Sequence, residues 1–555
     1  MKTIVSILKE HFDNAPNKIF CRFVAEENIE DISYKKLVEK SFGYAEHFKN
    51  KNISKGYPVI IMLRHSPDLF YSFLGAMFIG AIPSILPFPS EKQDINLHRD
   101  SIEKLSRRIG AKSIITYKEN LAEVEEISKY LKIDIATPEE VKSGKITWSD
   151  EINENDVAFL QHSSGTTGLK KGVALSHRAV INQIETYSKS INLHQDDVIV
   201  SWLPLYHDMG LIACFILPLI KKAPLVMIDP FEWVVNPKIM FEQIEKNKGT
   251  LCWLPNFAFN FLVRCIDTNA EKYNLSSMRA LINCSEPCKL HSFEIFHNQF
   301  KSYGIKMEAL QTCYAMAENV FAITQSEIGK KVKVDYIGKE SLIREHTAKK
   351  SGRESMNSIS FLSVGKTIPN NEIRIVDNNR KEIGERQVGE IKVASNSLFS
   401  GYFKLPEESA KVIEEKWFYT GDLGYVADNE LYITGRKKDL IIVHGRNYYA
   451  HDIEYISNHV ERIKKGRCVA VGVYNDEIGS EEAVLIAETE IDSEEMKSKI
   501  MKEIKKRVSE ELNLNLREVY LVPLRWLIKT TSGKISRTEN KNKYLKEKNS
   551  GSDYN

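Results

Sequence analysis

The sequence predicts an α/β protein whose large N-terminal domain is built on doubly wound, largely parallel sheets. Short apolar runs bounded by turn residues alternate with segments of helical periodicity, which is the pattern of βα units. The run Tyr57–Leu63 is one such strand, and a buried helix over Leu69–Gly80 is expected after it. Several of the predicted strands also end in polar turns, where open α/β sheets bind ligands.

The elements follow one another in a regular order. Apolar and polar residues alternate over residues 19–32, which predicts a β-hairpin. Over residues 34–48 the apolar residues have helical spacing. Further strands are expected at 113–116, 157–160, 173–175, 198–204, 225–228, 250–254 and 280–283, with helices at 101–108 and 178–191.

The chain changes character after Val320. Residues 326–360 are highly charged and poor in apolar periodicity, which is typical of a surface insertion. Alternating β patterning resumes at 372–376 and 389–393, and residues 419–424 read as a tight polar turn.

The charged joint Gly435–Asp439 predicts a domain boundary. We expect an N-terminal domain over residues 1–435 and a smaller C-terminal domain over residues 436–546, with βα units and a long amphipathic helix at about 493–512. Residues 547–555 are polar and predict a disordered tail.

Composition narrows the class of protein. The 77 basic and 75 acidic side chains nearly cancel, so no nucleic-acid or membrane partner is indicated. The eight cysteines contain no CxxC pair, which favours reduced thiols in a cytoplasm over a metal site or a disulfide framework. The uncharged run Leu69–Ser90 contains three prolines and predicts a buried helix and strand, with no membrane span.

The loop Ser163–Gly172 is rich in serine, threonine and glycine and ends in a basic pair. Small residues let the backbone approach an anion, and hydroxyls, N–H groups and Lys171 supply donors and charge. A polar turn between two strands explains the composition equally well. The Walker pattern fails, because Gly168 is followed by Gly172 and then Val173.

The order of several short motifs resembles the adenylate-forming superfamily. These motifs are the loop with Lys171, Tyr314–Glu318, Thr420-Gly421-Asp422, Gly435-Arg436 and Gly533-Lys534. The superfamily includes acyl-CoA synthetases, luciferases and adenylation domains of peptide synthetases. The resemblance covers roughly residues 20–545 of the chain.

Within the superfamily the chain resembles the fatty acyl-AMP ligases, on the stretches Ser201–Ile212, Pro255–Ala258, Gly435–Ile442 and Gly445-Arg446-Asn447. The resemblance implies a β-barrel-like subdomain, a small mobile C-terminal α/β domain and an insertion near 326–360 that disfavours productive CoA binding. It implies that ATP and Mg²⁺ convert a fatty acid to acyl-AMP. The acyl group then passes to the phosphopantetheine thiol of a separate acyl carrier protein, and the enzyme is expected to be a monomer.

The resemblance also assigns roles to residues. Lys534 would stabilise the charge that develops in adenylation, His207 would lie between acyl carboxylate and adenylate, and Lys171 would clamp phosphate. Glu318 would hold Mg²⁺, and Lys438 would be the hinge. The nucleotide would be bound by Ser163, Ser164, Gly165, Thr166, Thr167, Gly168, Ser285, Glu286, Tyr314, Ala315, Met316, Ala317, Asp422 and Arg436.

Each role has a structural alternative. Lys534 could be a solvated lysine, Glu318 an acid at a helix N-terminus, and Asp422 an ordinary turn residue. The family pattern is broken at Lys170, Cys284 and Ile528; a positive φ at Cys284 would cost about 1–3 kcal/mol. The acyl tunnel is expected along residues 209–217 and 257–262, where apolar spacing fits core packing equally well.

Other functions remain open at this point. CoA could be the acceptor in place of a carrier protein, or the substrate could be an amino or aryl acid. A non-catalytic nucleotide-binding protein on a decayed ligase fold is the alternative from a different class. The presence of Lys534, Glu318, Asp422 and Lys171 weighs against that alternative.

Overall fold

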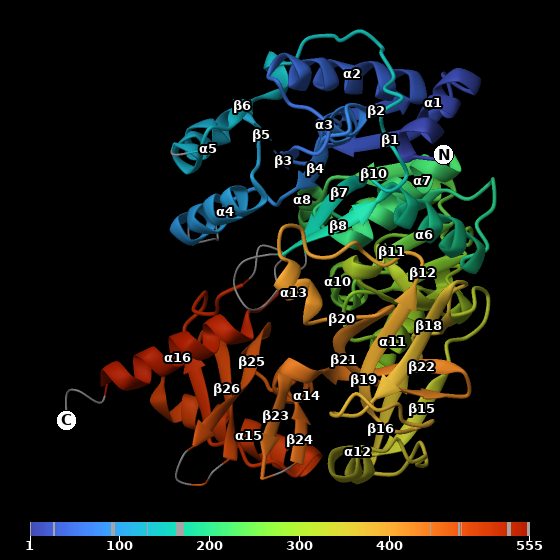
Figure 1. Cartoon of the computed structure of the whole chain (residues 1–555). Helices are drawn as coiled ribbons and strands as arrows, with labels where there is room; N and C mark the ends of the chain where they lie inside the picture. The colour runs from blue at the N-terminus through green and yellow to red at the C-terminus, as the bar shows by residue number, and fades with distance from the viewer. Residues whose placement is uncertain are drawn as a thin grey trace.

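The computed structural model of the chain, shown in Figure 1, describes residues 2–25, 28–89, 95–129, 131–162, 171–444, 446–475, 478, 480–529 and 534–551. It has the mixed α/β architecture that the sequence predicts. A large N-terminal part contains the main sheets, and a smaller C-terminal part, red in Figure 1, lies beside its lower half.

The largest sheet has the strand order β17-β14-β13-β12-β11-β9-β10-β1-β2. Every pairing from β1 to β13 along this order is parallel, so the carboxyl ends of these six strands lie along one edge. The strands are β1 (Ile19–Ala25), β2 (Asn28–Ser33), β9 (Ile199–Ser201), β10 (Leu225–Ile228), β11 (Leu251–Leu254), β12 (Ala280–Asn283), β13 (Leu310–Ala315), β14 (Ala322–Gln325) and β17 (Lys366–Thr367).

Helices connect and cover these strands. They are α1 (Ile4–Asn14), α6 (His177–Ser190), α7 (Leu217–Lys221), α8 (Pro230–Val235), α9 (Ile239–Asn247), α10 (Asn256–Cys265) and α11 (Leu290–Phe300). The segment Met209–Ile216 ahead of α7 is a π-helix in which all eight residues are buried. π-Helical turns are rare and occur often at functional sites.

A second, four-stranded sheet is parallel throughout, in the order β4-β3-β5-β6. Its strands alternate with helices as the apolar runs predict. These elements are α2 (Tyr34–Asn50), β3 (Pro58–Met62), α3 (Asp68–Phe78), β4 (Ile82–Ile85), α4 (Ile95–Ile109), β5 (Ser113–Thr116), α5 (Leu121–Ser128) and β6 (Asp134–Ala136). A hairpin of β7 (Val157–His162) and β8 (Gly172–Ser176) follows, and most of the loop between them lies outside the described residues.

An antiparallel sheet of five strands occupies the place of the expected barrel-like subdomain. Its members are β18 (Asn371–Val376), β19 (Gly389–Ser395), β20 (Ile413–Glu414), β21 (Trp417–Ala427) and β22 (Glu430–Arg436), with α13 (Pro406–Ala410) beside them. The predicted polar turn at 419–424 is wrong, because these residues lie inside β21. Cross-strand pairing with β19 and β22 overrides the local turn composition.

The charged segment 326–360 forms regular structure that its weak periodicity does not reveal. It contains β15 (Val334–Gly338) and α12 (Lys339–Glu345), and leads into β16 (Ser358–Leu362), which pairs antiparallel with β15. Ile337 and Leu342 are buried, and Asp335 accepts hydrogen bonds from Arg386 and Tyr425. A few buried apolar residues are enough to fold this charged segment, because it packs on a neighbouring sheet.

The C-terminal part has its own three-stranded sheet and core. It consists of β23 (Leu440–Val443), β24 (Arg446–Tyr449), α14 (Ala450–Ser457), β25 (Ile463–Asn475), β26 (Ser480–Thr489), α15 (Glu494–Leu512), β27 (Glu518–Val522) and α16 (Arg537–Gly551). The expected βα alternation is only partly correct, because β25 and β26 pair as antiparallel neighbours. The expected boundary after residue 435 falls at the end of β22.

Residues 547–551 of the predicted disordered tail are helical. Helix α16 continues to Gly551, because its end has partners on and near β27. Glu547 accepts from the Tyr520 hydroxyl at 3.0 Å and from Trp526 Nε1 at 3.1 Å. Lys548 lies 2.6 Å from Glu518.

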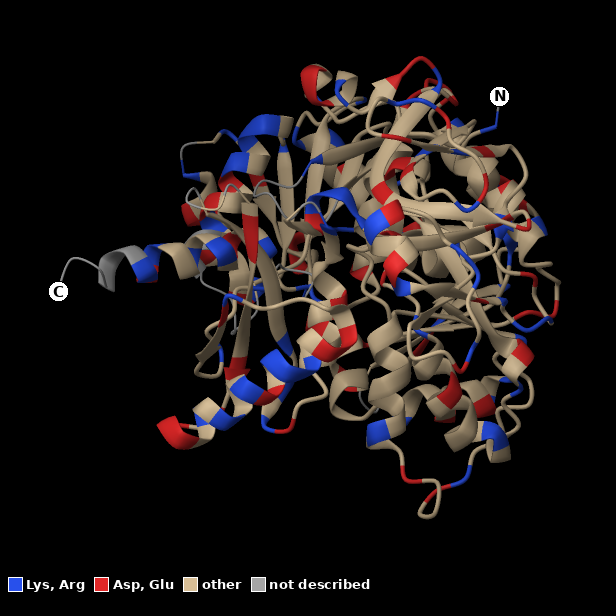
Figure 2. Ribbon diagram, turned by 90° about the horizontal axis from the view of Figure 1, so that it is seen from below, with Lys and Arg blue, Asp and Glu red and all other residues tan. Residues whose placement is uncertain are grey.

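In the ribbon of Figure 2, seen from below, basic and acidic residues are intermingled along the chain in both parts. Among the helices of the described ranges, none combines the length and apolar character needed to cross a bilayer.

Candidate functional site

The carboxyl edge of the nine-stranded sheet gathers residues from three parts of the sequence. The turn after β9 carries His207, the turn after β12 carries Ser285 and Glu286, and β13 leads to Glu318. Because β9, β11, β12 and β13 are parallel neighbours, the turns that follow them open on the same side.

Tyr314, Asp422 and Arg436 form one hydrogen-bonded group. The Tyr314 hydroxyl donates to Asp422 Oδ2 at 2.7 Å, and Arg436 Nε lies 2.9 Å from Oδ1 of the same carboxylate. Tyr314 and Asp422 are buried, whereas the Arg436 side chain is 48% exposed. A carboxylate can accept about four hydrogen bonds, so Asp422 can accept more than these two.

The charges in this group support one another. The carboxylate of Asp422 raises the pKa of the Arg436 guanidinium. Burial, and then the charge of Asp422, raise the pKa of Tyr314 well above its usual range. The phenol therefore stays protonated at neutral pH and remains a donor.

Lys534 reaches the turn after β12 although it belongs to the C-terminal part. Its Nζ donates to the carbonyl oxygen of Ser285 at 3.2 Å. Burial raises the pKa of both Glu286 and Asp208, and the positive charge of Lys534 opposes the rise in each case. The ammonium thus contacts one turn of the sheet edge, and its charge acts on carboxyl groups of two turns.

Glu286 also contacts the first turn of α10. Its Oε2 accepts from the backbone N–H of Phe257 at 3.0 Å, in the first turn of α10. A carboxylate is favoured there because the helix N-terminus carries partial positive charge. The neighbouring Ser285 has a φ of 67°, whereas Cys284 is outside the set of described residues with positive φ. The backbone strain considered for Cys284 therefore does not arise.

His207 lies in a tight turn that glycine makes possible. Its N–H donates to the Pro204 carbonyl at 3.2 Å, and its own carbonyl accepts from Leu211 N–H at 2.8 Å. A Cβ on Gly210 would lie 2.3 Å from the Pro204 oxygen, so only glycine fits. Asp208 caps the π-helix by accepting from Met209 N–H at 2.8 Å.

Glu318 and Lys171 are linked through Tyr402. The Tyr402 hydroxyl donates to Glu318 Oε1 at 3.0 Å. Lys171 Nζ lies 4.7 Å from the centroid of the Tyr402 ring and 2.7 Å from Glu408 Oε2. The hydrogen bond from Lys171 is the main cause that lowers the pKa of Glu408 to about 2.

Burial raises the pKa of the Glu318 carboxyl, and nearby Asp208 raises it further. The charges of Glu318 and Asp208 repel each other, and a bound cation would relieve that repulsion. Two residues beyond Glu318, Val320 has φ 62° and ψ −55°, a strained conformation for a β-branched residue.

Nine of the predicted nucleotide-binding residues remain to be placed. Ala315 ends β13, Met316 donates its N–H to the Phe321 carbonyl at 2.9 Å, and Ala317 begins a short 3₁₀ turn that contains Glu318. The other six lie outside the described residues: Ser163, Ser164, Gly165, Thr166, Thr167 and Gly168. At the edge of that gap, His162 Nε2 lies 2.5 Å from Ser84 Oγ.

The predicted hinge, Lys438, lies in a 3₁₀ turn, Lys437–Asp439, between β22 and β23. Arg537, three residues after Lys534, binds this turn through Asp439 at 2.9 Å. The same guanidinium makes two bonds to Glu454 of α14, at 3.1 and 2.7 Å. Arg537 therefore ties the segment that carries Lys534 to the junction of the two parts.

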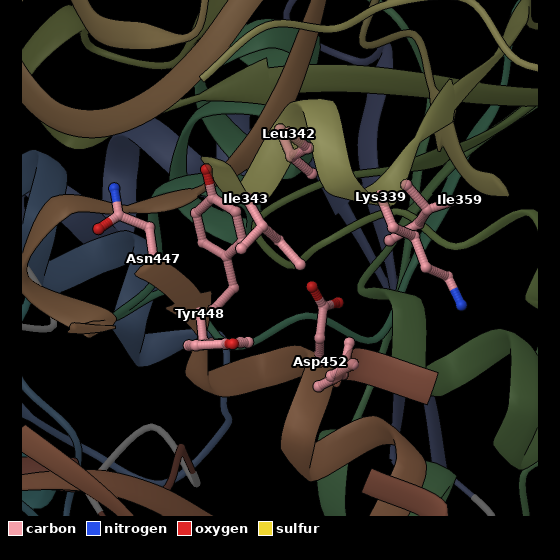
Figure 3. A pocket seen from close by; sticks show the side chains of 9 residues that line it. Lys339, Leu342, Ile343, Ile359, Asn447, Tyr448 and Asp452 are labelled. Carbon is pink, nitrogen blue, oxygen red and sulfur yellow. The ribbon is translucent and has the colours of Figure 1, made fainter. Parts of the chain in front are cut away.

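The insertion also contacts the C-terminal part. A small pocket lies between α12 and the elements around β24. Figure 3 shows Leu342 and Ile343 on one side of it and Asn447, Tyr448 and Asp452 on the other. Ile343 packs against the core of the C-terminal part.

Four residues of this constellation were not predicted: Asp208, Tyr402, Glu408 and Arg537. Asp208 carries a usable signal, because an aspartate before an apolar run is a typical helix N-cap. Nothing local distinguishes Tyr402, Glu408 or Arg537, which become relevant only through partners far away in the sequence.

Comparison with known proteins gives consistent results. A profile of the family described as AMP-binding enzyme matches residues 8–403. A medium-chain-fatty-acid–acyl-carrier-protein ligase of Moorena producens is 28% identical over 98% of this chain and 95% of its own length. A probable long-chain-fatty-acid–AMP ligase of Mycobacterium tuberculosis is 31% identical over 68% of each chain.

A solved structure from a study of fatty acyl-adenylate ligases of E. coli and L. pneumophila has the same fold. It superposes with a TM-score of 0.91, at 26% identity, over 99% of this chain and 98% of its own.

Removing the Arg537 side chain should destabilise the C-terminal part. Arg537→Ala leaves Asp439 and Glu454, both largely buried, without their cation, which costs about 3 kcal/mol. The midpoint of urea unfolding, followed by fluorescence, should fall clearly. Arg507→Ala is the matched control, because its pair with Glu503 on α15 is far more exposed and contributes about 0.3–0.5 kcal/mol. Equal shifts for both variants would contradict the assigned role.

Proposed function

This chain belongs to the family of AMP-binding enzymes, and we propose that it is an ATP-dependent ligase that activates a fatty acid as acyl-AMP, with release of pyrophosphate. It then transfers the acyl group to the phosphopantetheine thiol of an acyl carrier protein. The observation that carries the proposal is the position of Lys534. A lysine from the C-terminal part lies on the sheet edge beside Ser285, close enough to act on Asp208 and Glu286.

The chemistry of the first step explains why a lysine is needed there. A carboxylate must attack the α-phosphate, so two anions come together and negative charge builds up in the transition state. A preorganised ammonium stabilises that charge more than water can. Lys534 would exchange its contact with the Ser285 carbonyl for substrate oxygens, and His207 would lie between carboxylate and phosphate.

Nucleotide binding is assigned to the groups around β12, β13 and β21. Asp422 would accept hydrogen bonds from the ribose hydroxyls, with Arg436 paired to it and Tyr314 orienting it. The adenine would lie against Tyr314, the backbone of residues 315–317 and the turn of Ser285 and Glu286. The phosphates would be held by Lys171 together with the loop residues from Ser163 to Gly168.

The residues present fit Mg²⁺. Magnesium prefers one or two carboxylates plus phosphate oxygens, and Glu318 has a half-buried carboxyl group whose pKa is raised by desolvation and further by Asp208. When bound, the ion would neutralise phosphate charge. Tyr402 keeps Glu318 in place through its hydrogen bond.

The acceptor is inferred from relatives and from the insertion. One relative is named as an acyl-carrier-protein ligase, and α12 of the insertion packs against the C-terminal part. That contact would hinder a rearrangement that CoA requires. We also propose that the domain boundary falls near residues 435–436 and that Lys438 is the hinge about which the C-terminal domain turns between the two half-reactions.

The deciding experiment measures pyrophosphate release with straight-chain acids of increasing length. Acceptor assays with CoA and with a phosphopantetheinylated carrier protein follow. We expect acid-dependent pyrophosphate release and transfer to the carrier protein. Acyl-CoA formed as fast as the carrier product would overturn the acceptor assignment, and no release with any acid would overturn the proposed function.

Lys534→Ala should separate the two half-reactions. Loss of the ammonium should lower adenylate formation by at least about 100-fold, the range for removing one preorganised charge-stabilising group. Transfer from presynthesised acyl-AMP to the carrier protein should stay within a few fold of the wild-type rate. Lys541→Ala, on α16 of the same part, is the control and should change neither rate; equal loss of both steps in Lys534→Ala would contradict the assignment.

Asp422→Asn should weaken ATP binding. The change removes the charge that Arg436 and the ribose hydroxyls would share, and a hydrogen bond to a charged group contributes about 1.5–3 kcal/mol. Titration calorimetry should therefore give a dissociation constant raised about tenfold or more. Asp428→Asn, an exposed aspartate at the end of the same hairpin, should bind ATP as the wild type does. Unchanged binding in Asp422→Asn would remove Asp422 from the nucleotide site.

A further inference from the structure

Glu408 lies beside the candidate site, and the proposed reaction gives it no role. Its Oε2 atom accepts a hydrogen bond from Lys171 Nζ at 2.7 Å, although the two residues are 237 positions apart in the sequence. The side chains of Lys171 and Glu408 are 31% and 33% exposed, so both still reach solvent. The lysine to which phosphate binding is assigned is thus paired with a carboxylate of the protein itself.

The backbone on both sides fixes this contact. Residues 400–403 pair with residues 172–174 of β8 through hydrogen bonds of 2.7 to 3.1 Å. The N–H of Tyr402 also donates to Oγ of Ser409 on α13 at 2.8 Å, which ties that helix to the same segment. Because β8 begins directly after the lysine and α13 carries the glutamate, the two side chains are held opposite each other.

Glu408 also has a second cation. Lys411, which directly follows α13, donates to Oε1 of the same carboxylate. Hydrogen bonds from Lys171 and then Lys411 lower the pKa of Glu408 to about 2, so the carboxylate is charged at physiological pH. Glu408 can therefore give up Lys171 at little cost, because Lys411 and water remain as its partners.

We propose that Glu408 is an exchangeable counter-ion of Lys171. It holds the ammonium until the phosphates of ATP take it over, and it competes with pyrophosphate for the ammonium so that this product can leave. The inference rests on the proposed function and adds a positioning residue to it, because Glu408 acts on the phosphates only through Lys171.

The proposal fixes the sign of the effect on phosphate binding. Either the phosphate displaces Glu408 from the ammonium, or both anions share the ammonium and repel each other. In both cases the carboxylate weakens the binding of phosphate. A merely structural role predicts the reverse, because Lys171 would be misplaced without its partner and would bind phosphate less well.

The test measures the dissociation constants of ATP and of pyrophosphate by titration calorimetry, with the full-length protein and no acid present. Glu408→Gln keeps the size of the side chain and removes its charge. It should lower both constants about two- to fivefold, the range that follows from the strength of a partly exposed ion pair. Glu407→Gln makes the same change at an exposed residue of the same helix and should bind both ligands as the wild type does.

Two further variants connect the effect to Lys171. Lys411→Met leaves Glu408 to Lys171 alone, so both constants should rise by about twofold. This opposite shift, at an exposed residue, carries the test if Glu408→Gln does not fold. In a Lys171→Ala background, Glu408→Gln should change neither constant.

The outcomes separate this inference from the proposed function. Constants that rise or stay unchanged in Glu408→Gln, or a tightening that persists in the Lys171→Ala background, would overturn the counter-ion role. The proposed function would still stand if a fatty acid gives pyrophosphate release. A wild-type protein that neither binds ATP nor releases pyrophosphate with any acid would overturn both.

Discussion

The placement of one positive charge organises this structure. Lys534 comes from the C-terminal part, and its ammonium lies on the carboxyl edge of the main sheet, where it donates to the Ser285 carbonyl and its charge acts on Glu286 and Asp208. Those groups come from separate turns that meet only because the strands before them are parallel.

Around this charge the site is built from short polar relays. Lys171, Tyr402 and Glu318 form one, and Tyr314, Asp422 and Arg436 form another. In each relay a tyrosine hydroxyl donates to a carboxylate, which fixes the direction of its oxygens before any ligand arrives. Such preorganisation lowers the cost of ordering charged groups during reaction.

The contacts between the two parts explain how Lys534 is held in this position. Arg537 joins the segment after Lys534 to the junction through Asp439 and to α14 through Glu454. The insertion adds a second contact, where Ile343 packs on the C-terminal core. The Ile343 contact would have to change if the C-terminal part were to turn about Lys438, whereas the bonds of Arg537 join residues that all follow Lys438 and would turn together.

The sequence by itself determined the fold class and predicted most of the candidate site. Buried apolar runs such as Tyr57–Leu63 indicate strands, and ordered motifs single out Lys534, Asp422 and Glu318 as candidates without coordinates. Tertiary structure alone decided the rest. Residues 419–424 lie inside β21 because two neighbouring strands pair with them, and α16 reaches Gly551 because Tyr520, Trp526 and Glu518 hold its end. Arg537 and Tyr402 acquire meaning only from partners remote in sequence. Lys534 and Ser285 are 249 residues apart, and no local pattern records which distant atoms a fold brings together.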